Sequence, residues 1–125
     1  MGKFVISKAK TGVMFNLFAG NGEIIATSEV YNSKTAAKNG IASVIRNSDA
    51  AVEDQTKDGY KVESCPKYEI YKDKKGEFRF RLKARNGQII AVGESYKDIA
   101  GVKNGVASIK KNATESTKII DETLD

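Results

Sequence analysis

The stretch FNLFAGNGEIIA at residues 15–26 recurs as FRLKARNGQIIA at residues 80–91, and this repetition decides the fold. With an offset of 65, residues 15–47 match residues 80–112 at 16 of 33 positions. For residues 3–12 the offset between the copies is 64, so the second copy has one inserted residue after Gly76. A repeat of this length indicates two copies of one structural unit, and it has to be interpreted before any local feature.

Each copy is predicted to begin with three strands. The first copy has a short predicted strand at residues 4–7, an alternating run at residues 15–19 and a returning run at residues 24–26. Alternation with a period of two is typical of a strand that buries one face. The dipeptides Asn21-Gly22 and Asn86-Gly87 predict type I′ hairpins, in which both central residues have positive φ. The corresponding runs of the second copy lie at residues 68–71, 80–84 and 89–91.

Each copy continues with one amphipathic helix and a short last strand. Ser33 and Asp98 are predicted N-caps, and Asn47 and Asn112 are predicted to end the helices in the left-handed conformation. Apolar residues recur between them with a helical period. These are Ala37, Ile41 and Val44 in the first copy and Ile99, Val102, Val106 and Ile109 in the second. The last strands are predicted at residues 51–54 and 119–122.

A unit of about 60 residues buries too little apolar surface to be very stable alone. Two units that share a sheet or a core remove this problem and hide sheet edges. The chain is therefore predicted to form one compact α+β domain with a pseudo-twofold axis. Its parts are a first repeat at residues 1–56, a connector at residues 57–66 and a second repeat at residues 67–125.

The pattern F-x-L-x-A-x-N-G-x-I-I-A, followed by E-x-Y and by K-N-G-I/V-A-S, occurs twice and resembles the YegP-like family of small, uncharacterised, mainly bacterial proteins. The resemblance covers residues 3–56 and 67–123. It implies two tandem β3-α-β repeats that form a single antiparallel sheet with the helices packed on one face. It also implies that the C-terminal strands of the repeats are swapped, so that the monomer is an internal pseudo-dimer; further homo-oligomerisation stays open. The family brings no established activity, cofactor or catalytic residue.

The composition limits the chemistry that the chain offers. It has 21 Lys and Arg residues against 16 Asp and Glu residues, a formal net charge of +5, no His and one Cys. These counts exclude a Cys/His zinc site, a Ser-His or Cys-His nucleophile pair and an intrachain disulfide. The apolar run at residues 4–6 is too short for a secretory signal, and no stretch approaches the roughly 18 apolar residues of a membrane span. We expect a basic, cytoplasmic protein that neither enters a membrane nor carries a cofactor or metal.

The basic stretch at residues 72–85 is the least symmetric feature of the sequence. It holds seven cations and two anions. Strand alternation puts several of the cations on the outer face of the sheet, about 6.6–7 Å apart, where they suit contacts with phosphates. The stretch is a candidate surface for nucleic acid or an acidic protein, and a solvated charged strand is the simpler explanation. The candidate residues are Lys72, Lys74, Lys75, Arg79, Arg81, Lys83 and Arg85.

In the first copy, Met14 and Phe18 occupy the positions that match Arg79 and Lys83 of the basic stretch. Both are predicted to lie on the solvent side of their strand. An exposed apolar pair of this kind marks a contact with another chain. Alternatively, the connector covers the pair through Tyr60 and Val62. The sequence leaves both interpretations open.

Two further motifs occur in both copies. Glu29-x-Tyr31 and Glu94-x-Tyr96 precede the helices, where the helix dipole stabilises a carboxylate and a tyrosine packs its ring while its hydroxyl stays at the surface. Asn39-Gly40 and Asn104-Gly105 lie in the middle of the helices, where glycine costs about 1 kcal/mol relative to alanine. Close packing of the helix is the favoured explanation for these glycines, ahead of a helix distortion that exposes backbone groups to a ligand.

The leading functional hypothesis is a non-enzymatic binding or interaction module that acts through its sheet face. The first alternative is electrostatic binding of nucleic acid or an acidic partner through residues 72–85. The second is a small hydrolase that uses Glu29 and Glu94 as an acid-base pair, which the lack of His disfavours. Cys65, next to Pro66, is expected to be an inert thiol because no His can act as its base. The sequence assigns no catalytic, cofactor-binding or metal-binding residue, and the partner stays unknown.

Overall fold

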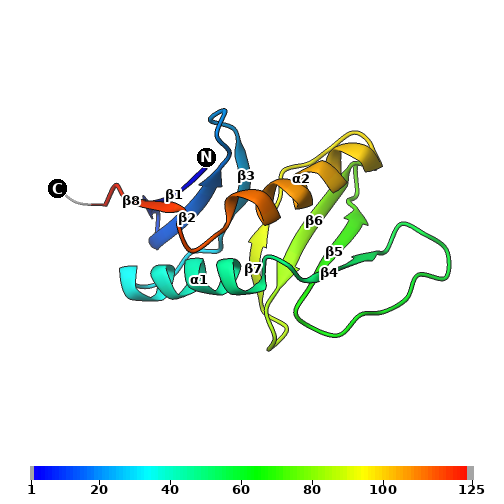
Figure 1. Cartoon of the computed structure of the whole chain (residues 1–125), viewed down its shortest axis with the longest axis horizontal. Helices are drawn as coiled ribbons and strands as arrows, with labels where there is room; N and C mark the ends of the chain where they lie inside the picture. Colours follow the sequence, from blue (N-terminus) through cyan, green and yellow to red (C-terminus); the bar gives the residue numbers. More distant parts are fainter. Residues whose placement is uncertain (1, 124–125) are drawn as a thin grey trace.

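The computed structural model describes residues 2–123, so the outermost residues of the two predicted repeats, Met1 and residues 124–125, lie outside the described residues. The elements follow the order that the repeat predicts (Figure 1). The first copy contains β1 (Lys3–Ala9), β2 (Gly12–Phe18), β3 (Ile24–Thr27), α1 (Lys34–Asn47) and β4 (Ala51–Asp54). The second copy contains β5 (Lys67–Lys72), β6 (Phe78–Lys83), β7 (Ile89–Val92), α2 (Ile99–Asn112) and β8 (Lys118–Asp121).

All strands belong to one eight-stranded sheet with the order β4-β5-β6-β7-β3-β2-β1-β8. The six inner strands are antiparallel, but β4 pairs parallel to β5 and β8 pairs parallel to β1. The prediction of a wholly antiparallel sheet is therefore wrong at both edges. Each last strand is the outer neighbour of the first strand of the other half and runs in the same direction as that strand.

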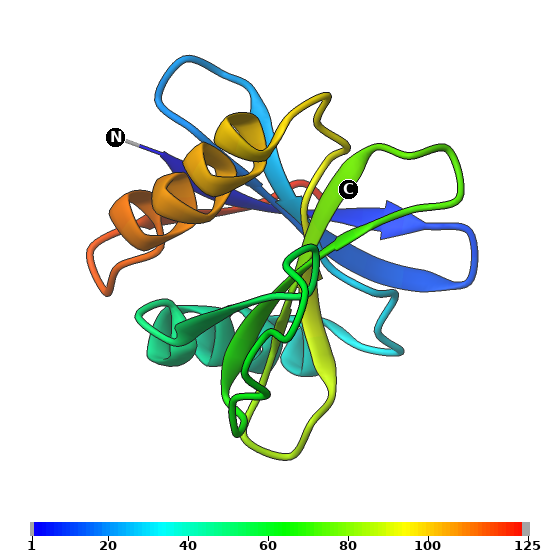
Figure 2. The same cartoon turned by 90° about the vertical axis from the view of Figure 1, so that its right-hand side faces the viewer.

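Both helices lie on the same side of the strongly twisted sheet (Figure 2). The two halves meet at its centre, where β3 and β7 pair only through Thr27 and Val92. Each helix contacts strands of both halves: α1 packs on β1, β2 and β7, and α2 packs on β2, β3 and β6. In the described part of the chain, neither helix is long and apolar enough to cross a bilayer.

The buried apolar side chains form one cluster to which both copies contribute. Its largest fully buried members come in equivalent pairs, such as Phe15 with Phe80 and Leu17 with Leu82. The predicted apolar stripes of both helices face this cluster, with Ile99 half-buried at its margin. The two halves therefore share one interior, as expected for units that are too small to bury a core alone.

The predicted first and last residues of both helices are confirmed, but the left-handed conformation predicted at the two helix ends is wrong. Ser33 Oγ accepts the N–H of Ala36 at 3.0 Å, and Asp98 caps α2 in the same way. No described residue other than glycine has a positive φ, so Asn47 and Asn112 do not adopt the left-handed conformation. Their side-chain amides instead donate back to the carbonyls of Ser43 and Ser108 in the preceding turn, each at 2.9 Å.

The hairpins also differ from the predicted type I′ geometry. Gly22 has a φ of +87°, but Asn21 does not have a positive φ. The N–H of Gly22 donates to the carbonyl of Ala19 at 2.9 Å, and Asn21 Oδ1 accepts the N–H of Glu23 at 3.1 Å. Only the glycine of the dipeptide needs the left-handed region, and the asparagine stabilises the turn through its side chain. The hairpin at Asn86-Gly87 repeats this arrangement.

Candidate binding groove between the repeats

Tyr31 reaches α1 from the segment between β3 and the helix. Its ring stacks on Phe15 with centroids 6.1 Å apart, and its hydroxyl lies over Gly40, where an added Cβ would stand 2.4 Å from the hydroxyl oxygen. Tyr96 and Gly105 repeat this contact at the same 2.4 Å. A side chain at either glycine would displace the tyrosine, so close packing explains the mid-helix glycines.

A groove runs between α1 and the hairpin that joins β6 to β7, so both repeats build it. It has two adjoining parts of about 260 and 630 Å³ that share Ser43, Ala84 and Asn86. We call this the first groove. The smaller part, the tyrosine end, is lined by Glu29, Tyr31, Ala36, Asn39, Gly40, Ser43, Ala84, Asn86, Gln88 and Ile90. The larger part, the arginine end, is lined by Ser43, Arg46, Asn47, Pro66, Ala84, Arg85 and Asn86.

The lining of the tyrosine end is repeated almost completely in the other half of the chain. Eight of its ten residues have an identical residue 65 positions away, and only Ala36 and Gln88 differ, with Gly101 and Glu23 in their places. Over residues 15–47 as a whole, the identity is 16 of 33. The tyrosine end is therefore better retained between the copies than the surrounding chain.

Two polar side chains of the tyrosine end, those of Glu29 and Asn39, are not used to hold the fold together. Within residues 2–123, neither Glu29 nor Asn39 makes a side-chain hydrogen bond or ion pair, and both are exposed. Burial raises the pKa of Tyr31, and the Glu29 carboxylate raises it further. The phenol therefore stays protonated at neutral pH and offers one donor and one acceptor to a ligand.

Carboxylates from both copies lie near Tyr96. Burial raises the pKa of Tyr96, and the carboxylates of Glu94 and Glu23 raise it further. Glu23 belongs to the β2–β3 hairpin, so the hairpin of the first copy lies near the tyrosine of the second copy. The structure thus places Glu29 and Glu94 beside different tyrosines, and it does not bring them together as an acid-base pair.

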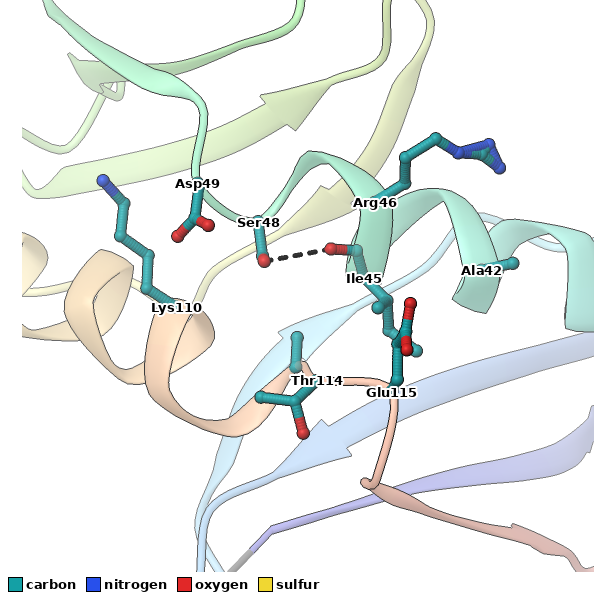
Figure 3. A pocket seen from close by; sticks show the side chains of 9 residues that line it. Ala42, Ile45, Arg46, Ser48, Asp49, Lys110, Thr114 and Glu115 are labelled. Carbon is teal, nitrogen blue, oxygen red and sulfur yellow. Dashed lines mark hydrogen bonds between the residues drawn. The ribbon is translucent and has the colours of Figure 1, made fainter.

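A third hollow of about 750 Å³ lies where the two helices end (Figure 3). Its lining mixes the charges of Lys110, Asp49 and Glu115 with that of Arg46, which also lines the arginine end of the first groove. The Ser48 hydroxyl is used to cap the carbonyl of Ile45 at 3.0 Å. Of its nine lining residues, only Ala42 has an identical counterpart 65 positions away. This hollow therefore lacks the internal retention that distinguishes the tyrosine end of the first groove.

The predicted basic surface is divided among several environments. Arg81 and Lys83 both contact Glu69, at 2.6 and 3.2 Å, and Arg79 lies 3.8 Å from Asp73. Lys72 lies over the ring of Phe78, and Lys74 and Lys75 are exposed in the turn before β6. Arg85 lies beyond the end of β6 and lines the first groove.

Buried ion pairs on the outer face of the second half form a charge network, which consists of Glu53, Lys67, Glu69, Arg81 and Lys83. Lys67 Nζ lies 2.7 Å from Glu53 Oε1 and 3.1 Å from Glu69 Oε2. Only 2% of Glu53, 7% of Lys67 and 3% of Glu69 is exposed. The connector reaches this network, because the N–H of Glu63 donates to Glu53 Oε1 at 2.7 Å.

The charge network fixes the protonation of its members. Burial by itself would raise the pKa of Glu53, but hydrogen bonds from Lys67, Gln55 and the N–H of Glu63 outweigh it and lower the pKa to about 2. The hydrogen bond to Glu53 is the main reason that the pKa of Lys67 is raised. Both groups are therefore charged at neutral pH.

Met14 and Phe18 are half-buried in β2, and Lys3 Nζ lies 5.7 Å from the centre of the Phe18 ring. The connector lies on the opposite side of the molecule, beside β4 and β5 (Figure 1). Its Tyr60 and Val62 are 42% and 70% exposed and are not the cover of this pair. Cys65 is a half-buried free thiol at the end of the connector.

The sequence identifies the motifs that line the first groove, but it does not show that they lie next to one another in the fold. Glu29-x-Tyr31, Asn39-Gly40 and Asn86-Gly87 each stand out as motifs, and the structure brings all three to one place. The sequence feature that points to a binding site is that exposed, polar residues of these motifs are identical in both copies. Because the helix of one copy meets the hairpin of the other, no pattern within a single copy reveals the groove.

A sequence profile described as "Domain of unknown function (DUF1508)" matches residues 9–54 and 73–119, one match in each half. The chain is 47% identical over 125 residues to the UPF0339 protein YegP of Yersinia pestis, covering 99% of this chain and 98% of that one. It is 41% identical over 120 residues to YegP of Escherichia coli, covering 93% and 94%.

Two solution NMR structures share the fold. The E. coli protein yegP, itself of unknown function, has a TM-score of 0.79 at 39% identity, with 99% of this chain and 95% of that chain covered. A UPF0339 protein from Shewanella oneidensis has a TM-score of 0.79 at 36% identity, with 99% and 93% covered.

Proposed function

The chain belongs to the DUF1508 family, whose function is unknown, and we propose that it is a non-enzymatic binding module whose ligand lies in the first groove. The observation that carries the proposal is the retention of the tyrosine end, where eight of ten lining residues are identical between the copies. Packing accounts for Gly40 and Ala84. It does not account for Glu29 and Asn39, whose side chains bond to no other described residue.

Binding suits the groove better than catalysis does. A catalytic phenol needs a lowered pKa to act as a base or nucleophile, whereas burial and Glu29 raise the pKa of Tyr31. A protonated phenol, a carboxylate and an amide in one groove are groups that orient a polar ligand by hydrogen bonds. The basic surface at residues 72–85 supports the alternative of an acidic partner less well, because Glu69 and Asp73 already neutralise part of it.

The groove depends on how the two repeats are joined, and we propose that they exchange their last strands. The first repeat (residues 1–56) would donate β4 to the second (residues 67–125), and the second would donate β8 to the first. The pairings of β4 with β5 and of β8 with β1 support this interpretation. The connector at residues 57–66 then spans the step from one half to the other, and the cytoplasmic monomer is an internal pseudo-dimer.

A screen of the ¹⁵N-labelled protein by NMR against a library of small polar compounds tests the proposed function. We expect the binding compounds to shift the backbone amides of Tyr31, Asn39, Ser43 and Asn86. Replacing both Glu29 with Gln and Asn39 with Ala should reduce their affinity by about tenfold or more, as expected when hydrogen bonds to a ligand, one of them charge-assisted, are removed. The fold should be unaffected, because both side chains are exposed.

Two control variants keep this test specific. Lys38→Gln changes an exposed α1 residue that is identical in both copies but does not line the groove, and it should leave binding unchanged. Lys74→Gln combined with Lys75→Gln changes the basic turn. If the compounds shift residues 72–83 instead, and lose affinity only in the Lys74/Lys75 variant, the groove is not the binding site and the basic surface is.

A further inference from the structure

The arginine end of the first groove presents two cations without an intramolecular partner. Arg46 comes from α1 and Arg85 from the β6–β7 hairpin, and among residues 2–123 neither guanidinium forms an ion pair. Figure 3 shows Arg46 extending away from Asp49 and Glu115, the nearby carboxylates of the neighbouring hollow. Two unpaired guanidinium groups from different elements on one hollow favour an anionic group there.

Asn47 supplies the same place with a free hydrogen-bond acceptor. Its Nδ2 donates to the carbonyl of Ser43 at 2.9 Å, but within the described chain its Oδ1 accepts nothing. In the other half, Asn112 is the counterpart of Asn47, and its Oδ1 accepts the backbone N–H of Gly2 at 3.0 Å. The first groove has Pro66 at the position that matches Gly2, and proline has no N–H to donate.

In the other half of the molecule, the equivalent oxygen, Asn112 Oδ1, thus accepts a main-chain N–H. Sulfate satisfies the arginines but has no hydrogen to donate to Asn47, and inorganic phosphate offers an O–H instead of the N–H that Asn112 accepts. The C-terminal residue of a peptide carries a carboxylate and an N–H on the same Cα, so one residue serves both groups. The Ser43 hydroxyl and the Asn86 side-chain amide, which donates to no described residue, are further donors for the carboxylate.

The two arginines also distinguish the first groove from the equivalent positions in the other half of the chain. Lys111 and Gly20 occupy the positions that match Arg46 and Arg85, and Gly20 carries no charge. In the other half, the carboxylates of Glu23 and Glu94 lie near Tyr96. An anionic ligand is therefore favoured in the first groove and disfavoured around Tyr96.

We propose that the arginine end of the first groove binds the C-terminal carboxylate of a peptide or N-acyl amino acid, with Arg46 and Arg85 on the carboxylate and Asn47 Oδ1 on the adjacent N–H. This assignment rests on the proposed function and names its ligand class.

Four probes test the assignment by NMR titration of the full ¹⁵N-labelled chain. They are N-acetyl-glycyl-alanine with a free carboxylate, its C-terminal amide, N-acetyl-glycyl-sarcosine, and inorganic phosphate. We expect the free acid to shift the side-chain amide of Asn47 and to bind at least about tenfold more tightly than the amide, because charge-assisted hydrogen bonds are lost with the charge. Sarcosine keeps the carboxylate but has no N–H, and it should bind several-fold more weakly than the free acid.

The arginine variants locate the effect. In the Arg46→Gln and Arg85→Gln double variant, the affinity for the free acid should fall to the affinity for the amide. The matched Lys111→Gln variant should bind the free acid as tightly as the unchanged protein does. Equal binding of acid and amide, an acid unaffected by the two arginine substitutions, or phosphate binding as tightly as the acid would overturn the assignment. If the assignment fails in one of these ways, NMR shifts of the Tyr31 and Asn39 amides caused by compounds of the polar library would still support the proposed function. If those shifts are also absent, both the ligand assignment and the proposed function are wrong.

Discussion

Replacing Lys67 with methionine is expected to lower the free energy of unfolding by about 3 kcal/mol at pH 7. Methionine fills a similar volume, so the loss is that of the charge. It leaves Glu53 buried without a cation, and removing one partner of a buried ion pair costs about 3–5 kcal/mol. The depressed pKa of Glu53, about 2 instead of 4.5, corresponds to a stabilisation of the same order, roughly 3 kcal/mol.

The pH dependence of this variant follows from the direction of the Glu53 shift. A carboxylate whose pKa is lower in the folded state contributes stability above its unfolded pKa and loses it as the pH falls through its folded pKa. Wild-type stability should therefore fall between about pH 5 and pH 2. Without Lys67, burial favours the protonated form of Glu53, so the gap between variant and wild type should narrow over the same interval.

Urea unfolding at pH 7 and at pH 3 measures both effects, and Lys3→Met is the matched control. Lys3 holds the equivalent position in the first half, but it is exposed, and its ammonium group lies over the Phe18 ring and forms no ion pair with any residue in the described range 2–123. Its loss should change the free energy of unfolding by less than about 0.5 kcal/mol. Equal effects of the two substitutions, or a Lys67 effect that does not depend on pH, would show that the charge network does not stabilise the folded protein.

The sequence predicts what depends on neighbouring residues and misses what depends on contacts between the halves. The repeat, the order of elements and the caps at Ser33 and Asp98 follow from local periodicity and capping chemistry, and they are confirmed. The direction of β4 and β8 is not local, because it depends on the strand against which each one pairs. The Asn-Gly turns were assigned by their commonest geometry, but here the asparagine bonds the backbone through its side chain instead.

The same distinction applies to the surface. Alternation predicts that Arg81 and Lys83 share the outer face of β6, but it does not predict that Glu69 of β5 lies opposite them and binds both. Glu53 reaches the network from β4, which joins β5 only through the pairing of the two halves. The first groove is missed for a similar reason, since Tyr31 and Asn86 lie in different repeats. Predictions at a single strand therefore overestimated the free positive charge and overlooked the shared site.

The exchange of last strands between the repeats is the claim on which the charge network depends, because it places Glu53 of β4 beside Lys67 of β5. Deleting residues 117–125 removes β8, and its pairing with β1 runs from Lys3 opposite Lys118 to Ile6 opposite Asp121. A ladder of about three hydrogen bonds, each worth about 1 kcal/mol, is lost from that edge. We expect the remaining fold to persist, because every other strand keeps its partners.

Amide hydrogen exchange of the shortened chain, compared residue by residue with the full-length protein, tests this claim most directly. Backbone amides of β1 should exchange about a hundredfold faster, since each 1.4 kcal/mol corresponds to a factor of ten. Amides of β5, whose outer neighbour is β4, should remain protected at least tenfold better than those of β1. Faster exchange centred on β5 and β6, with β1 unchanged, would mean that each repeat keeps its own last strand and would contradict the account.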